Sequence, residues 1–171
     1  MKDNLKIAKT LIEALPYIQK FRGKTVVLKF GGSIGSKEFA NFSRDLVLMK
    51  FVGINPVVVH GGGIEITKAL SSSNIKATFV NGLRVTCDKT MEIVEKVLVG
   101  KVNKQIVSKI KSNGGVSIGL SGRDHQLLKV KKVKSLKKGI DLGRVGEITK
   151  VNVSHIFELQ SKGYIPVIAP I

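Results

Sequence analysis

The sequence contains a single cysteine, Cys87, and only three histidines, and these four residues show no spacing typical of metal ligands. One cysteine cannot form a disulfide within the chain, so a disulfide-stapled scaffold is excluded. A lone thiol fits a reducing compartment, and we expect a cytoplasmic location, or the plastid stroma if the gene is carried by an organelle. We expect no metal ion held by the protein's own side chains.

Long apolar runs are also missing. No apolar stretch approaches the ~18–20 residues that a membrane-spanning helix needs, and the N-terminus lacks the pattern of a cleavable signal peptide. Tryptophan is absent, and residues 80–156 contain no aromatic residue of the Phe, Tyr or Trp type. Aromatic platforms for stacking bases are therefore absent from that half of the chain. We expect neither a membrane nor a nucleic acid as partner.

Positive charge, by contrast, is abundant, with 29 basic residues against 12 acidic ones and a net charge of +17. Such a charge attracts anions of any kind, so a nucleic-acid binder is one alternative. The lysines that would serve it fall within residues 126–148, a stretch whose alternation and glycines predict a basic hairpin with a solvated face. They are Lys129, Lys131, Lys132, Lys134, Lys137 and Lys138.

Apolar periodicity along the chain predicts an α/β fold. After residue 24 the order strand, glycines, helix occurs twice, beginning with the strands over 25–30 and 57–59. This order is typical of the start of a parallel α/β sheet. A helix is predicted over 5–21, bent or restarted at Pro16, and a long helix over 88–112, capped by Asp88. The other predicted helices cover 39–49, 64–70 and 153–162. The predicted strands, apart from the hairpin, cover 25–30, 57–59, 116–120 and 164–171.

The first strand holds the most informative lysine. Val26, Val27, Leu28 and Phe30 read as a buried strand, and Lys29 stands among them. Burying an ammonium group without a partner is costly, so a lysine here either reaches out from an edge strand or meets a negative charge. It comes just before a glycine loop, which favours the second interpretation.

Two glycine loops follow buried strands, one at Gly31 and Gly32, the other at Gly62 and Gly63. Glycine lets backbone N–H groups approach a ligand, and the start of a helix adds partial positive charge, so each loop is a natural anion site. Both would open at the carboxyl edge of a parallel sheet, where ligands bind. Neither loop has the spacing of a Walker loop or a dinucleotide-binding GxGxxG. The segment "HGGG" is similar to the oxyanion loop of esterases, but "GLSGR" does not complete the GxSxG elbow that they also need, which argues against an esterase.

The segment "NGLRVT" reads as a turn with Arg84 placed between two apolar residues. An arginine in this setting can bind a carboxylate with two hydrogen bonds. A surface arginine without a ligand is the other interpretation, and the segment alone does not decide between them.

Seven segments together resemble the acetylglutamate kinases of the amino-acid kinase superfamily over residues 8–171. They are "VVLKFGGS", "VVVHGGG", "NGLRVT", "GKVNKQIV", "IGLSGRD", "DLGRVGEI" and "GYIPVIAPI". The resemblance implies a three-layer αβα fold with a mainly parallel sheet, to which the basic hairpin and the N-terminal helix are added. It also implies ATP, with Mg²⁺, as the co-substrate. The reaction implied is phosphorylation of the γ-carboxylate of N-acetyl-L-glutamate to N-acetyl-L-glutamyl 5-phosphate, a step of arginine biosynthesis.

The resemblance also implies a role for each candidate residue. Lys29 would stabilise the phosphoryl group during its transfer, and Arg84 would bind a substrate carboxylate. The N–H groups of Gly62 and Gly63 would hold the substrate. Gly31 and Gly32 would face the nucleotide phosphates.

The stretch "EALPYIQKF" resembles the N-terminal helix of family members that are inhibited by arginine and form ring-shaped hexamers. It implies an interlacing helix over residues 1–21, an acetylglutamate-binding domain over 22–171, and L-arginine as a feedback inhibitor. A homodimer would pair through the 88–112 helix.

Members of this family are nearly twice as long, and the rest of their length carries most of the ATP pocket and a second phosphoryl-stabilising lysine. The resemblance therefore implies that the 171-residue chain has no kinase activity by itself. Two alternatives stay open, a non-catalytic remnant that serves as an interaction module, and another amino-acid kinase acting on carbamate, glutamate or aspartate.

Overall fold

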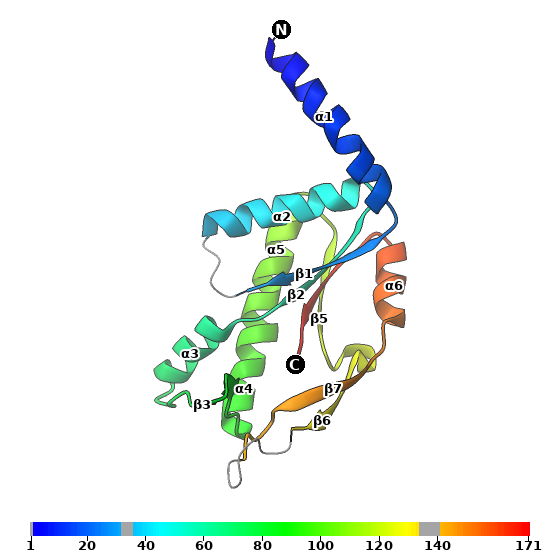
Figure 1. The fold of residues 1–171 in the computed structure, drawn as a ribbon. Coiled ribbons are helices and arrows are strands. Elements are labelled where there is room, and N and C mark those ends of the chain that lie inside the picture. The colour runs from blue at the N-terminus through cyan, green and yellow to red at the C-terminus, as the bar shows by residue number, and fades with distance from the viewer. Residues whose placement is uncertain (1, 32–35, 134–140) are drawn as a thin grey trace.

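The computed structural model describes residues 2–31, 36–133 and 141–171. Its centre is a parallel sheet of four strands in the order β1–β2–β8–β5 (Figure 1). These strands are β1 (Thr25–Phe30), β2 (Asn55–His60), β8 (Ile165–Ala169) and β5 (Ser117–Ser121). The register joins Phe30 to His60, so the two strands that precede the glycine loops end side by side.

Helices cover both faces of this sheet, as the resemblance to the kinase family implies. One face packs against α2 (Ser36–Phe51), α3 (Gly63–Ser72), α4 (Asp88–Val97) and α5 (Lys104–Ser112). The other face packs against α6 (Ser154–Ser161), where Ile156 and Leu159 meet Val57, Leu120 and Ile168. The predicted α/β class and parallel sheet are confirmed.

The long helix predicted over 88–112 has an unpredicted segment at its centre. Between α4 and α5 the chain forms a π-helical stretch, η1 (Leu98–Asn103), whose turns are wider than those of an α-helix. α4, η1 and α5 form one continuous rod over residues 88–112. One row of its buried apolar residues repeats at intervals of four: Val94, Leu98, Val102, Ile106 and Ile110. A regular α-helix has 3.6 residues per turn and would rotate such a series off its face. The wide turn keeps the series on the core.

The prediction that the first strand is buried is wrong. β1 is the outermost strand of the sheet, and its side chains alternate between a packed face and an open one. Phe30 packs into the core, whereas Val27 is 64% exposed and Lys29 lies on the same open face. Lys29 is therefore solvated and needs no buried partner.

The N-terminal helix is present as one continuous element, α1 (Lys2–Phe21), with Pro16 inside it. It projects from the body of the protein (Figure 1). Its apolar stripe is exposed along its length and includes Leu5, Leu11, Ile12 and Leu15. None of the helices within the described ranges combines the length and the apolarity needed to cross a bilayer.

Two small hairpins and a short turn complete the chain. The first hairpin pairs β3 (Phe79–Val80) with β4 (Leu83–Arg84), and the second pairs β6 (Leu128–Lys132) with β7 (Gly146–Val151). A 3₁₀ turn, η2 (Asp124–Gln126), precedes β6. The basic hairpin is confirmed, and both of its strands are largely exposed, while the predicted basic residues Lys134, Lys137 and Lys138 lie outside the described residues.

Candidate substrate site at the second glycine loop

The second glycine loop connects β2 to α3. The amide of Gly61 donates to the carbonyl oxygen of Phe30 at 3.1 Å, so the loop extends the pairing of β1 with β2 by one more bond. Gly62 is the N-cap residue and Gly63 begins α3. The first amides of a helix have no acceptor within it, which suits an anionic ligand at this loop. The role of the Gly62 and Gly63 N–H groups stays a prediction.

Gly62 has a packing reason to be a glycine. A Cβ at this position would lie 2.6 Å from Cδ2 of Leu98, on η1. The missing side chain lets the start of α3 rest directly on the long helix. The loop is thus held between the sheet edge and the π-helical segment.

Arg84 reaches this loop from β4. The turn at Asn81 and Gly82, both in the left-handed region with φ of 49° and 79°, reverses the chain so that β4 runs back beside β3. The Nη2 group of Arg84 donates to the carbonyl oxygen of Gly63 at 3.2 Å and to Oγ1 of Thr67 at 2.9 Å. Two predicted site residues, Arg84 and Gly63, are therefore in direct contact.

The guanidinium of Arg84 is held by its neighbours through some of its atoms, while the hydrogen-bonding capacity of its Nη1 atom is unsatisfied among the described residues. Its central carbon lies 4.6 Å from the centre of the Phe79 ring, a cation–π arrangement. Its Nη1 atom is buried and has no hydrogen-bond partner among the described residues. Burial lowers the pKa of Arg84. A buried donor without an acceptor is costly, so an anion that displaces the cover of Nη1 and accepts from it would be favoured.

Lys29 and Gly31 lie at the neighbouring end of β1. The register pairs Lys29 with Val59, one residue before the end of β2, so both glycine loops leave the same edge of the sheet. Among the described residues, a Cβ at Gly31 would meet nothing within 4 Å. Gly32 lies outside the described residues. The roles of these residues stay predictions.

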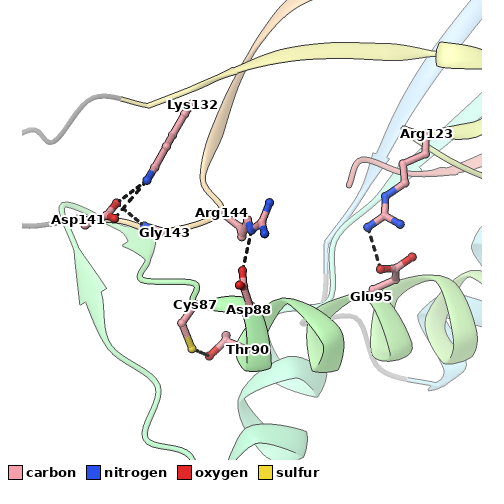
Figure 2. Close-up of polar contacts among 9 residues, drawn as sticks. All are labelled: Cys87, Asp88, Thr90, Glu95, Arg123, Lys132, Asp141, Gly143 and Arg144. Carbon is pink, nitrogen blue, oxygen red and sulfur yellow. Dashed lines mark hydrogen bonds and ion pairs between the residues drawn. The ribbon is translucent and has the colours of Figure 1, made fainter.

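A broad cleft extends from Arg84 toward the carboxyl ends of β5 and β8. Its walls come from α4, from the basic hairpin and from the end of the chain at Ile171. Two arginines on one wall pair with carboxylates of α4 on the other (Figure 2). Arg144 Nε lies 2.7 Å from Asp88 Oδ1, and Arg123 Nη2 lies 2.9 Å from Glu95 Oε2.

The backbone also connects the two walls. The amide of Thr86 donates to the carbonyl oxygen of Leu142 at 3.0 Å, and the amide of Arg144 donates to the carbonyl oxygen of Thr86 at 2.7 Å. Gly143, with φ of 70°, sits against Thr86 where a side chain has no room. These hydrogen bonds join segments that are far apart in the sequence, so no local sequence pattern predicts them. The sequence analysis missed this connection between the two walls.

The prediction that Asp88 caps the long helix is wrong. The N-cap position is taken by Cys87, and no side chain caps the helix there. Asp88 instead pairs with Arg144, whose hydrogen bond and charge lower the pKa of Asp88. Sγ of Cys87 lies 3.4 Å from Oγ1 of Thr90, and that hydrogen bond is the main reason why the pKa of the thiol is lowered (Figure 2).

Comparison with known proteins identifies the family. The sequence profile described as the amino acid kinase family matches residues 24–171. The chain belongs to the amino acid kinase family.

Among curated relatives of this kinase-family chain, two bacterial proteins named acetylglutamate kinase are close in sequence. The protein of Carboxydothermus hydrogenoformans is 54% identical over 181 aligned positions, which cover 100% of this chain and 61% of the relative. The protein of Caldanaerobacter subterraneus subsp. tengcongensis is 56% identical over 171 positions, which cover 99% of this chain and 56% of the relative. The chain thus spans somewhat over half the length of these relatives.

A solved structure supports the fold independently. The N-acetylglutamate synthase of Neisseria gonorrhoeae, complexed with coenzyme A and N-acetyl-glutamate, superposes with a TM-score of 0.80 at 21% identity. The match covers 95% of this chain and 37% of that protein. At this level of identity the likeness concerns the fold alone.

Proposed function

We propose that the chain is the acetylglutamate-binding portion of an ATP-dependent kinase that phosphorylates the γ-carboxylate of N-acetyl-L-glutamate. The observation that carries the proposal is the guanidinium of Arg84. It is fixed to Gly63 and Thr67 through Nη2, while its buried Nη1 lacks an acceptor among the described residues. The relatives named acetylglutamate kinase, at 54% and 56% identity, support this choice of substrate.

Each site residue has a chemical task in the proposed reaction. Arg84 binds one carboxylate of the substrate, and the amides of Gly62 and Gly63 hold its oxygens at the start of α3. A γ-carboxylate oxygen then attacks the γ-phosphorus of ATP, forming one O–P bond as the bond to the bridging oxygen of ADP breaks. The charge of Lys29 stabilises the phosphoryl group during its transfer, and Gly31 and Gly32 lie next to the nucleotide phosphates.

Mg²⁺ would accompany ATP and neutralise phosphate charge when the nucleotide binds. Within the described ranges, however, no group of three or more His, Cys, Asp or Glu residues could hold a metal ion. No residue of this chain is therefore assigned to the metal, and no step depends on it.

The proposal extends to assembly and regulation. Residues 1–21 would form the interlacing helix of an arginine-inhibited hexamer, and residues 22–171 the acetylglutamate-binding domain. The exposed apolar stripe of α1 supports the first part, because such a stripe is costly in water unless a partner covers it. The rod over 88–112 would pair in a homodimer. The single cysteine supports a cytoplasmic location for the protein.

The experiment that tests the proposal is calorimetric titration of the 171-residue chain with a series of candidate substrates. We expect saturable binding of N-acetyl-L-glutamate and none of L-glutamate, L-aspartate or carbamate at the same concentrations. Preferential binding of one of the other three would assign the chain to a sister kinase. Binding of none of the four would favour a non-catalytic interaction module.

A further inference from the structure

Two polar side chains are buried together behind the second glycine loop. His60, the last residue of β2, is 1% exposed, and Asn103, the last residue of η1, is 3% exposed. The Nδ2 atom of Asn103 lies 3.1 Å from Nε2 of His60. Buried polar groups of this kind are costly unless their hydrogen bonds are satisfied, so the direction of each bond matters.

The surroundings of Asn103 fix which atom is the donor. Its Nδ2 also lies 2.9 Å from the carbonyl oxygen of Val167 and 3.4 Å from that of Leu120. Carbonyl oxygens only accept, so the amide NH₂ must face this group of atoms. Nε2 of His60 is therefore an acceptor and carries no proton.

The other ring nitrogen leads to the same tautomer. Nδ1 of His60 lies 3.1 Å from the carbonyl oxygen of Gly61, which can only accept. Nδ1 must then carry the proton. Two independent contacts, one at each ring nitrogen, thus require the neutral ring protonated on Nδ1.

This tautomer has a consequence for the loop. In a trans peptide the C=O and the following N–H point in opposite directions. Because the His60 ring holds the Gly61 carbonyl, the N–H of Gly62 points away from the buried ring. We infer that Asn103 is a positioning residue, which keeps His60 protonated on Nδ1 and thereby turns the Gly62 N–H outward to the ligand.

Two features of the fold let Asn103 reach His60. Asn103 is the last residue of the π-helical segment η1, Leu98–Asn103, which places it against the sheet. On the facing strand β5, Gly119 has no side chain, and a Cβ there would overlap Oδ1 of Asn103. π-Helical turns are frequent at functional sites, and here the turn supplies the amide that orients the loop.

The tautomer does not depend on the proposed function, whereas its effect on acetylglutamate binding does. The first experiment is therefore NMR of the 171-residue chain with ¹⁵N-labelled histidine rings, of which there are only three. We expect the His60 ring to show a protonated Nδ1 and an unprotonated Nε2. A ring protonated on Nε2, or one that exchanges freely between the two forms, would overturn the inference.

The second experiment compares Asn103→Asp with Asn113→Asp. A carboxylate at 103 accepts where the amide donated, so we expect the proton of His60 to leave Nδ1 and move to Nε2. Asn113, the C-cap residue of α5, is the control, because it is a half-buried amide far from His60 in the same helical segment and donates to Ser43 Oγ at 2.8 Å. Its substitution should leave the His60 ring spectrum unchanged. An unchanged spectrum in folded Asn103→Asp would contradict the inference, and if that variant does not fold, the wild-type spectrum still decides.

Calorimetric titration of the same variants with N-acetyl-L-glutamate then tests the effect on the ligand. We expect Asn103→Asp to weaken binding about tenfold or more, as the loss of a hydrogen bond to a charged ligand does, and Asn113→Asp to leave it unchanged. Equal affinity in folded Asn103→Asp and wild type would reject the positioning role. If wild type does not bind acetylglutamate, the proposed function fails while the ring spectra still decide the tautomer.

Discussion

Gly119 of β5 and Asn103 of η1 share a space that has room for only one side chain. A Cβ at Gly119 would overlap Oδ1 of Asn103, and the amide of Asn103 is held in place by the carbonyl oxygen of Val167 at 2.9 Å. The hydrogen bonds of Asn103 thus depend on a glycine in the neighbouring strand.

We predict that Gly119→Ala destabilises the fold by about 1–3 kcal/mol, because it overpacks this contact. The measurement is urea denaturation. The control is Gly100→Ala, on the exposed side of η1, where the nearest neighbour of a Cβ would be Lys96 Cγ at 4.0 Å. That control should not lose stability, and a similar loss in both variants would mean that the contact with Asn103 is not the cause.

The buried ring of His60 predicts a loss of stability in acid. Burial lowers the pKa of His60, while the hydrogen bond to Gly61 raises it by less. As the pH falls through ~6.5, the unfolded chain takes up a proton on this ring and the folded chain does not. The stability present above that pH is then lost progressively down to the folded pKa. NMR titration of the ring should give a midpoint below ~6.5, and a midpoint above that value would contradict the prediction.

The thiol of Cys87 is predicted to react at lower pH in the folded chain than in the unfolded chain. Its hydrogen bond with Thr90 lowers the pKa of the thiol, and the thiolate is the reactive form. Thr90→Val should move the midpoint of iodoacetamide alkylation to higher pH. Thr149→Val is the control, because that hydroxyl bonds to the carbonyl oxygen of Lys129 on the exposed hairpin. Equal midpoints in wild type and Thr90→Val would show that Thr90 does not set the reactivity.

Much of the fold was predictable because its signals are local. Glycines directly after an apolar strand predicted both strand–loop–helix units, and the turn residues Asn81 and Gly82 predicted the reversal before Arg84. Whether an apolar strand is central or at an edge is not local, since it depends on what packs against each face. That is why the strand was predicted to be buried, and why an edge strand was only one of two interpretations for Lys29.

The contacts of the site were less predictable for the same reason. An aspartate at the start of a helix, such as Asp88, can cap the helix or pair with a distant cation such as Arg144. Only the path of the later hairpin decides which of the two roles it has. The π-helical segment did leave a signal, the unbroken intervals of four from Val94 to Ile110. Reading that period against 3.6 residues per turn would have predicted a wide turn, and with it the inward placement of Asn103.

The role proposed for Lys29 predicts an effect on rate without an effect on binding. In the complete enzyme, Lys29→Arg should slow acyl-phosphate formation by about 10²–10³-fold and leave the affinity for acetylglutamate unchanged. Lys24→Arg, just before the same strand, is the control and should turn over normally. Trapping the product with hydroxylamine measures the rate, and the 171-residue chain alone should give no measurable turnover. Unchanged turnover in Lys29→Arg would reject the role.

The central claim is that Arg84 and the second glycine loop form a carboxylate site, and calorimetric titration of N-acetyl-L-glutamate into the 171-residue chain tests it most directly. Arg84→Lys keeps the charge but cannot reproduce the two-pronged geometry, so we predict that it weakens binding at least tenfold. Arg44→Lys, on the exposed side of α2, is the control and should bind as wild type does. Equal affinity in wild type and Arg84→Lys would contradict the account.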